Sequence, residues 1–383
     1  MVDDGAAVNE DAIVRNKLTV FWDDRVLLHD TGVAFGEVPA SPLVEIQEKH
    51  VENADRLINM RSVLERGPIS DSMAWAQGRL ATIEELEAVH PRQYIDDVRK
   101  FIEAGGGYLE DNTVVSGESW EPLLAAAGTS LEAVDSVVSG RSSCAYALIR
   151  PPGHHAQTAQ AEGYGVFNHA ALMAERARAQ GVERVAIIDW DVHHGNGTQE
   201  IFYERDDVLY ISLHMRHGAW SPTHPQTGSA AEIGRGEGAG YNVNIELPVG
   251  SGDAAYRRAW QQIVEPVVDQ FDPELLIVSS GQDASAYDPN GRNCLSMRGF
   301  HQLGQLTREL ADRVTGGKIV AVQEGGYHLS YAAYCVHATC EGLLGLPAVL
   351  EDPIGYLPDD PQHGDSGINL TRTYLSRNWE FYV

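Results

Sequence analysis

The sequence predicts an α/β fold in which helices cover both faces of a central, mostly parallel β-sheet. Short apolar runs rich in β-branched residues alternate along the chain with longer segments whose apolar residues recur at helical spacing. The 383 residues suffice for one large α/β domain or two small ones, and no linker-like stretch divides them. Polar clusters follow several of the apolar runs, as ligand-binding residues do at the carboxyl edge of a parallel sheet.

The expected elements alternate in a regular order. Strands are expected at 18–22, 146–149, 185–189, 208–213, 275–280 and 319–323, and helices at 51–64, 82–102, 168–180, 254–271 and 299–314. The second helix is broken near Pro91, because proline lacks the backbone donor that a continuous helix needs. The glycines at 105–107 end the helical pattern, and 108–120 is expected to form a surface loop.

The balance of acidic and basic residues disfavours some classes of binding partner. The chain has 28 basic and 55 acidic residues, a formal net charge of −27, which counts against nucleic acid because phosphate binding needs clustered Lys and Arg. An acidic surface is compatible with a cationic substrate, although solubility alone also explains it. Four cysteines are too few for a disulfide framework, no signal-peptide pattern is found, and no apolar run approaches the ~20 residues of a membrane span. We therefore expect a cytoplasmic protein without a membrane partner.

A candidate metal site follows two of the expected strands. Asp191 and His193 come directly after the strand at 185–189, and positions two residues apart in extended chain point the same way. Asp283 follows the strand at 275–280 and offers a third ligand. A site with three protein ligands leaves room for water or substrate, as in hydrolytic metal enzymes.

Two histidines and a tyrosine are candidates for proton transfer and oxyanion binding at the same sheet edge. His154 and His155 lie in a Pro-Pro-Gly turn, where one can act as base and acid. Asp189 can orient one imidazole and Asn196 the other. Tyr327, after a Gly-Gly turn, can donate to the oxyanion of a tetrahedral intermediate. A surface histidine pair and an ordinary buried tyrosine are the alternatives for each motif alone, and their shared location favours catalysis.

Together these motifs resemble the arginase/deacetylase superfamily and, within it, the class II histone deacetylase-like amidohydrolases. The resemblance is carried by RPPGHHA (150–156), GYGVFN (163–168), DWDVHHGNGTQ (189–199), ISLH (211–214), DAS with DP (283–289) and QEGGY (323–327). It implies the three-layer α/β/α fold of that superfamily. The resemblance covers the catalytic domain expected over 18–345. The acidic, aperiodic composition at the start predicts an N-terminal arm over 1–17, and the Pro- and Asp-rich tail predicts a C-terminal extension over 346–383 that packs on the domain or on a neighbouring subunit.

The resemblance implies one Zn²⁺ per chain on Asp191, His193 and Asp283. Gly195 and Ser285 stand where the two-manganese arginases are expected to supply further carboxylates, so a second metal would lack ligands. One metal and amide hydrolysis are therefore favoured over guanidine hydrolysis. The mixed ligand set also accepts Fe²⁺, and structural K⁺ or Na⁺ sites, common in the family, stay open.

The resemblance also implies the roles of the other polar residues. His155 would be the general base and acid, with Asn196 beside it. His154, paired with Asp189, would assist electrostatically, and Tyr327 would polarise the scissile carbonyl.

Four positions are expected to bind the substrate. Gly163 would offer its carbonyl to the substrate amide, and Tyr164 would line the channel where deacetylases usually have Phe. Asn290 falls where protein deacetylases tend to carry an apolar residue and a polyamine-preferring relative carries Glu. Trp220 belongs to a long loop at the expected channel rim, where it either clamps substrate or anchors the loop.

The predicted function is zinc-dependent hydrolysis of an acyl amide, most simply an acetyl amide, by metal-activated water with a histidine base. The substrate would be an acetyl-lysine side chain or a small acylated amine. An acetylpolyamine amidohydrolase is the alternative within enzymes, and a catalytically silent protein that binds acyl groups or metal is the alternative from another class. A homo-oligomer stays open.

Overall fold

The structure is a computed structural model that describes residues 17–33, 40–110, 112–218, 227–354, 357 and 359–381. Its centre is an eight-stranded sheet in the order β2-β1-β5-β10-β9-β6-β7-β8, and every pair of neighbouring strands is parallel. The strands are β1 (Leu18–Trp22), β2 (Met73–Gln77), β5 (Cys144–Ala147), β6 (Val185–Asp189), β7 (Val208–Met215), β8 (Asn242–Leu247), β9 (Leu275–Ser280) and β10 (Ile319–Gln323).

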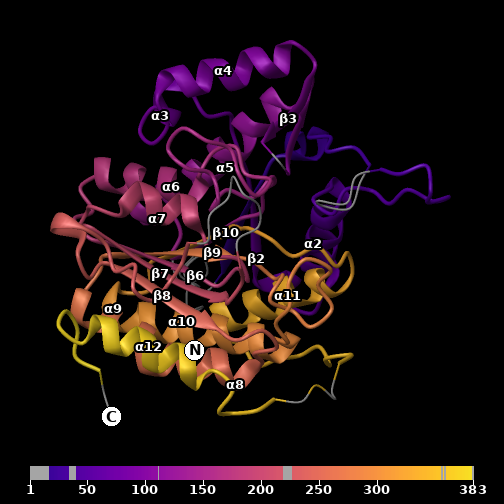
Figure 1. The fold of residues 1–383 in the computed structure, drawn as a ribbon. Coiled ribbons are helices and arrows are strands. Elements are labelled where there is room, and N and C mark those ends of the chain that lie inside the picture. Colours follow the sequence, from indigo (N-terminus) through magenta and orange to yellow (C-terminus); the bar gives the residue numbers. More distant parts are fainter. Residues whose placement is uncertain are drawn as a thin grey trace, which may run out of the picture.

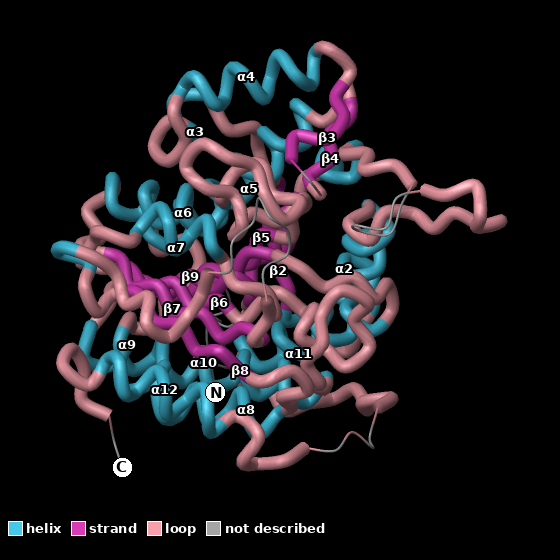
Figure 2. Tube along the Cα trace, in the orientation of Figure 1, coloured by secondary structure: helices cyan, strands magenta, loops and turns pink. Residues whose placement is uncertain are grey.

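Helices form a layer on each face of this sheet (Figure 1). The helices are α2 (Ala54–Arg66), α3 (Ile83–Leu86), α4 (Arg92–Glu103), α5 (Trp120–Val138), α6 (His169–Ala179), α7 (Asn196–Phe202), α8 (Asp253–Ala259), α9 (Glu265–Phe271), α10 (Met297–Val314), α11 (Tyr331–Leu343) and α12 (Asp365–Leu375). A π-helical turn, Trp260–Val264, joins α8 to α9, and short 3-10 turns cover Asp24–Leu28, Ser70–Ser72 and Gly236–Gly238. Figure 2 shows α5, α6 and α7 on one side of the strands and α8, α9, α10 and α12 on the other. The predicted three-layer α/β/α fold is confirmed.

Most predicted elements lie where the sequence places them. Strands β1, β6, β9 and β10 have the predicted bounds, whereas β5 both begins and ends two residues earlier and β7 ends two residues later than predicted. Pro91 caps the amino end of α4, so the predicted break near it is confirmed. The segment at 254–271 is helical throughout but passes through the π turn.

The predicted surface loop at 108–120 is wrong. Strands β3 (Gly106–Glu110) and β4 (Thr113–Ser116) form an antiparallel hairpin in this region, and α5 begins at Trp120. The glycine run predicts the end of a helix, but Gly106 lies inside the hairpin with φ of 76°. A Cβ there would lie 2.2 Å from the carbonyl oxygen of Val115, so glycine is what allows the two strands to approach.

The topology brings four polar clusters to one edge of the sheet. Strands β5, β10, β9 and β6 are consecutive neighbours, and all of their residues are buried. Because these strands are parallel, their carboxyl ends meet at the same edge, where ligands bind in open α/β sheets. The clusters at 150–155, 283, 324–327 and 189–193 follow these four ends.

A buried ion pair ties one of these clusters to the amino-terminal part of the chain. Arg150 is fully buried and binds Glu52 through two hydrogen bonds, Nε to Oε1 at 2.8 Å and Nη2 to Oε2 at 2.7 Å. Arg150 also donates to the carbonyls of Val26 and His29, and Arg56 donates to Glu52 Oε1 at 3.0 Å. Burial alone would raise the pKa of Glu52, but the two arginines hold it at about 2.

The described part of the C-terminal extension lies against its own domain. The Thr371 hydroxyl of α12 donates to the carbonyl of Asn244 in β8 at 2.7 Å. The Trp379 indole donates to the carbonyl of Gly240 at 2.8 Å. Nearly all of the predicted arm, 1–17, falls outside the described residues. Among the helices that are described, none combines the length and apolar character needed to cross a membrane.

We predict that Glu52→Gln costs about 3–5 kcal/mol of unfolding free energy, because it removes the charge that compensates two buried guanidinium groups. Urea unfolding measures this change. The matched control is Glu65→Gln, which disrupts a half-exposed pair with Arg61 on the surface of α2. We expect that control to change the free energy by no more than about 0.5 kcal/mol. Equal effects of the two variants would contradict the assigned role of the buried pair.

Candidate active site

Three predicted metal ligands converge at the carboxyl edge of the sheet. Asp191, His193 and Asp283 are all buried, and each offers a ligand atom within 4.8 Å of the others. Nδ1 of His193 lies 3.2 Å from Asp191 Oδ1 and 3.0 Å from Asp283 Oδ2. Burial and the neighbouring Asp191 carboxylate raise the pKa of Asp283, so a cation between the two carboxylates would relieve their repulsion. An imidazole with two carboxylates is a donor set that fits Zn²⁺ or Fe²⁺.

Backbone donors orient these two carboxylates. The amide of Gly325 donates to Asp191 Oδ2 at 2.8 Å, and the amide of Val192 donates to Asp283 Oδ1 at 2.9 Å. A Cβ at position 325 would lie 2.2 Å from Asp283 Oδ2, so only glycine allows the main chain to come this close. The remaining oxygens, Asp191 Oδ1 and Asp283 Oδ2, face the His193 imidazole.

His154 is held among carboxylates. Its Nδ1 donates to Asp189 Oδ2 at 2.9 Å, and the Tyr210 hydroxyl donates to the same oxygen at 2.9 Å. Nε2 of His154 lies 3.7 Å from Asp191 Oδ1. Burial by itself would lower the pKa of His154, but Asp189 and Asp191 outweigh it and hold the pKa well above the ordinary value. These two carboxylates therefore favour the protonated form of this imidazole.

His155 lies in the opposite electrostatic environment. Its Nδ1 lies 2.7 Å from Oδ1 of Asn196, the first residue of α7, and its ring centroid is 4.1 Å from that of His154. Burial lowers the pKa of His155 well below the ordinary value, and the charges of His154 and His193 act in the same direction. A neutral imidazole next to a charged one can accept a proton, which is what a general base requires.

Two buried residues near the histidines were not given a role by the sequence analysis. Glu324 Oε2 accepts from the amides of Gly153 and His154, at 2.7 and 3.2 Å, and burial raises its pKa to about 7. Glu324 belongs to the QEGGY motif, so its position was visible in the sequence although only Tyr327 was assigned a role. Tyr210 carries no such signal, because it reaches Asp189 from the middle of the neighbouring strand β7.

A cavity of about 360 Å³ leads to these groups. It is lined by Asn112, His155, Gly163, Tyr164, His193, Met215, Asn290 and Tyr327. The rings of Tyr164 and Tyr327 are nearly perpendicular, with centroids 5.7 Å apart, and Asn290 Nδ2 lies 3.4 Å from the Tyr164 hydroxyl. The sequence does not predict Met215 or Asn112 as cavity residues, because Met215 ends strand β7 and Asn112 lies where the sequence predicts a surface loop.

Gly163 brings the wall of this cavity against the candidate base. It has φ of 53°, and a Cβ there would lie 2.1 Å from Cδ2 of His155. The next residue, Tyr164, also has a positive φ, 69°, which costs free energy in a residue with a side chain. Of the four predicted substrate-binding residues, Gly163, Tyr164 and Asn290 line the cavity, and Trp220 lies outside the described residues.

Comparison with known proteins places the chain among deacetylases. Residues 50–343 match the model of the histone deacetylase domain. The chain is 44% identical over 366 residues to histone deacetylase 8 of Arabidopsis thaliana, with 94% of this chain and 97% of that protein covered. It is 38% identical over 337 residues to the histone deacetylase-like amidohydrolase of Pseudomonas aeruginosa, covering 87% and 88%. The crystal structure of the HDA15 HD domain superposes with a TM-score of 0.81 at 32% identity, covering 95% of this chain and 96% of that one.

We predict that zinc stabilises the protein that has been stripped of metal by a chelator. A Zn²⁺ concentration 1,000 times its dissociation constant should add about 4 kcal/mol of unfolding free energy. Asp191→Asn should remove most of this gain because it deletes a charged ligand. The matched control is Asp189→Asn, another fully buried aspartate at the same strand end, which should still bind one zinc. Elemental analysis and thermal unfolding measure both quantities, and equal zinc loss in the two variants would refute the ligand assignment.

Proposed function

Because the chain belongs to the histone deacetylase domain family, we propose that it is a zinc-dependent deacetylase acting on an acetyl-lysine side chain or a small acylated amine. Its relatives support the hydrolysis of acetyl amides in general. The observation that carries the narrower proposal is the pairing of His154 with the Asp189 carboxylate and of His155 with the neutral Asn196 carboxamide, at a cavity that also reaches His193. A catalytically silent binding protein would not need this difference between adjacent imidazoles.

Asp191, His193 and Asp283 would hold the metal, because their ligand atoms lie within 4.8 Å of one another and no other charged ligand is needed. When bound, Zn²⁺ supplies polarisation of the scissile carbonyl and a lowered pKa of the attacking water. Everything else in the reaction falls to side chains of this protein.

His155 moves the proton. As a water oxygen attacks the amide carbon, Nε2 of His155 accepts the proton that the water loses, while Nδ1 keeps its proton and donates to Asn196 Oδ1. When the carbon–nitrogen bond breaks, Nε2 returns that proton to the leaving amine. The immediate products are acetic acid and the neutral amine, and at neutral pH the proton of the acid ends on the amine, which gives acetate and an ammonium group. His154 stays protonated throughout and stabilises the negative charge that develops near it.

Tyr327 binds the developing oxyanion. Burial raises the pKa of its hydroxyl well above the ordinary value, so the group stays protonated and can donate. The Arg56 guanidinium carbon lies 4.5 Å from the centroid of the Tyr327 ring, and the Tyr327 amide donates to Asp288 Oδ2 at 2.6 Å. Both contacts keep the ring at the cavity.

The cavity favours a lysine-like acetyl amide. Tyr164 and Tyr327 provide aromatic walls for an alkyl chain, and none of the described residues that line the cavity is acidic. A polyamine carries further positive charges that an acid at the mouth would recognise, and the neutral Asn290 does not provide one. An acetylpolyamine amidohydrolase remains the second candidate, because the net charge of −27 favours cationic substrates in general.

The proposal includes a cytoplasmic location, with neither nucleic acid nor membrane as partner. The excess of acidic residues supports it, because it disfavours binding to phosphate-rich surfaces. Fe²⁺ in place of zinc, a structural K⁺ or Na⁺, and a homo-oligomer are compatible with the same proposal.

We predict that Tyr327→Phe lowers kcat about 100- to 1,000-fold while one zinc stays bound, because it removes a single donor to the oxyanion. Steady-state kinetics and elemental analysis of the same samples provide the measurement. Tyr334→Phe is the control, because Tyr334 is 42% exposed on α11 and does not line the cavity. Normal turnover by Tyr327→Phe would show that the oxyanion is bound by another group.

We predict that the zinc-loaded protein prefers an acetyl-lysine peptide to N-acetylputrescine. Asn290→Glu should raise kcat/KM for N-acetylputrescine about tenfold, because a carboxylate at the mouth contributes roughly 1.4 kcal/mol of attraction to the free ammonium group. Asn290→Gln, which keeps a neutral amide, is the control.

A wild-type preference for N-acetylputrescine would select the second candidate. If the zinc-loaded wild type hydrolysed neither substrate, both the acetyl-lysine and the acetylpolyamine assignments would be rejected, and a different small amide would be the substrate.

A further inference from the structure

We infer that Glu162 is a positioning residue that sets the tautomer of His155 through Asn196. The Glu162 carboxylate fixes which end of the Asn196 carboxamide faces His155, and that end decides which imidazole nitrogen carries the proton. The inference rests on the proposed amide hydrolysis, because it concerns the base of that reaction.

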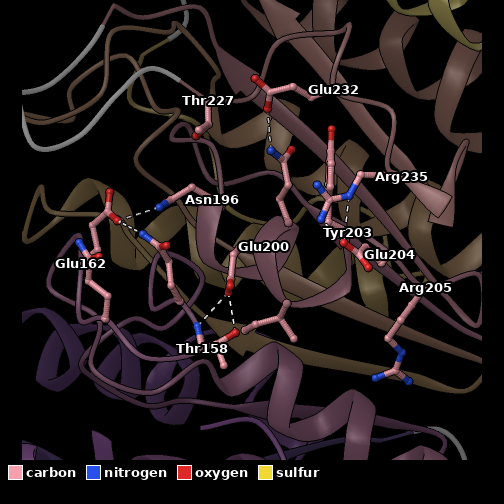
Figure 3. Close-up of a pocket in the computed structure, with 14 residues that line it drawn as sticks. Thr158, Glu162, Asn196, Glu200, Tyr203, Glu204, Arg205, Thr227, Glu232 and Arg235 are labelled. Carbon is pink, nitrogen blue, oxygen red and sulfur yellow. Dashed lines mark hydrogen bonds and ion pairs between the residues drawn. The ribbon is translucent and has the colours of Figure 1, made fainter. Parts of the chain in front are cut away.

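Three side chains form a continuous hydrogen-bonded series. Nδ2 of Asn196 donates to Glu162 Oε2 at 2.9 Å, and Oδ1 of Asn196 lies 2.7 Å from Nδ1 of His155. Gln157 Nε2 donates to the same Glu162 oxygen at 2.7 Å. Figure 3 shows the Glu162 carboxylate pointing toward Asn196, with dashed lines to two nitrogen atoms. Glu162 is only 5% exposed, so bulk water competes little for these bonds.

The chemistry of the groups leaves one consistent arrangement. The amide nitrogens of Gln157 and Asn196 both donate to Oε2 of Glu162, so this oxygen is the acceptor and the nitrogen end of the Asn196 carboxamide faces Glu162. The amide oxygen must then face His155, and an amide oxygen also only accepts. Nδ1 of His155 must therefore carry the proton, which leaves the lone pair on Nε2. That lone pair is what a base needs to take a proton from water.

Without the carboxylate, none of the side chains described in hydrogen bonds with Asn196 would fix the direction of its carboxamide, because Nδ1 of His155 can either donate or accept. A rotated carboxamide would present Nδ2 to His155, and the neutral imidazole would then carry its proton on Nε2 in order to accept at Nδ1. In that tautomer Nε2 has no lone pair to receive a proton. Glu162 thus acts on the reaction without touching the substrate.

The location of Glu162 supports a positioning role. It lines a second cavity, of about 880 Å³, together with Asn196 and Glu200 (Figure 3). No described residue lines both this cavity and the substrate cavity. Glu162 also exchanges two backbone hydrogen bonds with Gly165, at 3.0 and 2.8 Å. This turn carries Gly163 against the His155 ring, so the carboxylate and the base keep a fixed spacing.

The test is a double-mutant cycle at positions 162 and 196. Glu162→Gln should lower kcat about 10- to 100-fold, because the carboxamide at 196 can rotate. KM should change less than threefold, since the residue does not line the substrate cavity. Asn196→Asp should also lower kcat, because it places two carboxylates next to each other.

The combination of both substitutions should restore activity. The new glutamine can donate to the new carboxylate, which accepts from Nδ1 of His155, so the direction of every hydrogen bond is re-established. We expect the double variant to exceed both single variants in kcat. A purely structural role for Glu162 would make the two losses add.

Glu200→Gln is the matched control. Glu200 lines the same cavity, but its carboxylate accepts from the amide and hydroxyl of Thr158, at 2.9 and 2.6 Å, and not from Asn196. We expect the Glu200→Gln variant to keep the kcat and the zinc content of the wild type. A loss in Glu200→Gln as large as that in Glu162→Gln would overturn the inference, because it would show a general effect of charge in the cavity.

A spectroscopic measurement tests the tautomer itself. In protein labelled with ¹⁵N at histidine, long-range ¹H–¹⁵N spectra should show His155 protonated at Nδ1 in the wild type and protonated in part at Nε2 in Glu162→Gln. Unchanged spectra and unchanged kcat in Glu162→Gln would overturn the inference. Failure of the wild type to hydrolyse any acetyl amide would instead overturn the proposed function, while the spectra still decide the tautomer.

Discussion

The burial of four carboxylates at one edge of the sheet is the constraint on which the rest of the site depends. Asp189, Asp191, Asp283 and Glu324 are all fully buried. A buried carboxylate is costly unless hydrogen bonds or positive charges compensate it. The compensation comes from close main-chain amides, from two imidazoles and from the proposed metal. Gly325 follows from this constraint, because a side chain there would block the amide that binds Asp191.

The same constraint separates the roles of the two adjacent histidines. His154 lies next to Asp189 and Asp191 and takes up positive charge as part of their compensation. His155 faces a neutral carboxamide and adjoins an imidazole that is already charged, so a second proton there is unfavourable. One imidazole balances charge, while the other is kept neutral and so keeps a nitrogen lone pair. The difference arises from the group that is hydrogen-bonded to each ring, Asp189 at His154 and Asn196 at His155, and not from the histidines themselves.

The central strands and the residues that follow them are predictable from the sequence because their signals are local. A buried parallel strand is a continuous apolar run, and β6 and β9 have the bounds that this pattern predicts. The compensating partners are not predictable in this way. Glu52 is 98 positions from Arg150, and Glu162 is 34 positions from Asn196, so only the folded chain brings each pair together. The edge strands β2 and β8 were also missed.

The substrate cavity depends most on such distant contacts. Asn112 lines this cavity, and the Thr113 hydroxyl accepts from the Tyr164 amide at 3.1 Å. Both residues belong to the hairpin of β3 and β4, which the glycine pattern does not predict. That hydrogen bond helps to hold Tyr164 at its positive φ, and Asn290 reaches the Tyr164 hydroxyl from a segment 126 positions away. The catalytic groups lie on rigid strand ends, whereas the cavity wall is assembled from separate loops. Substrate choice can therefore change through loop residues such as Asn290 while the proton chemistry of His155 stays the same.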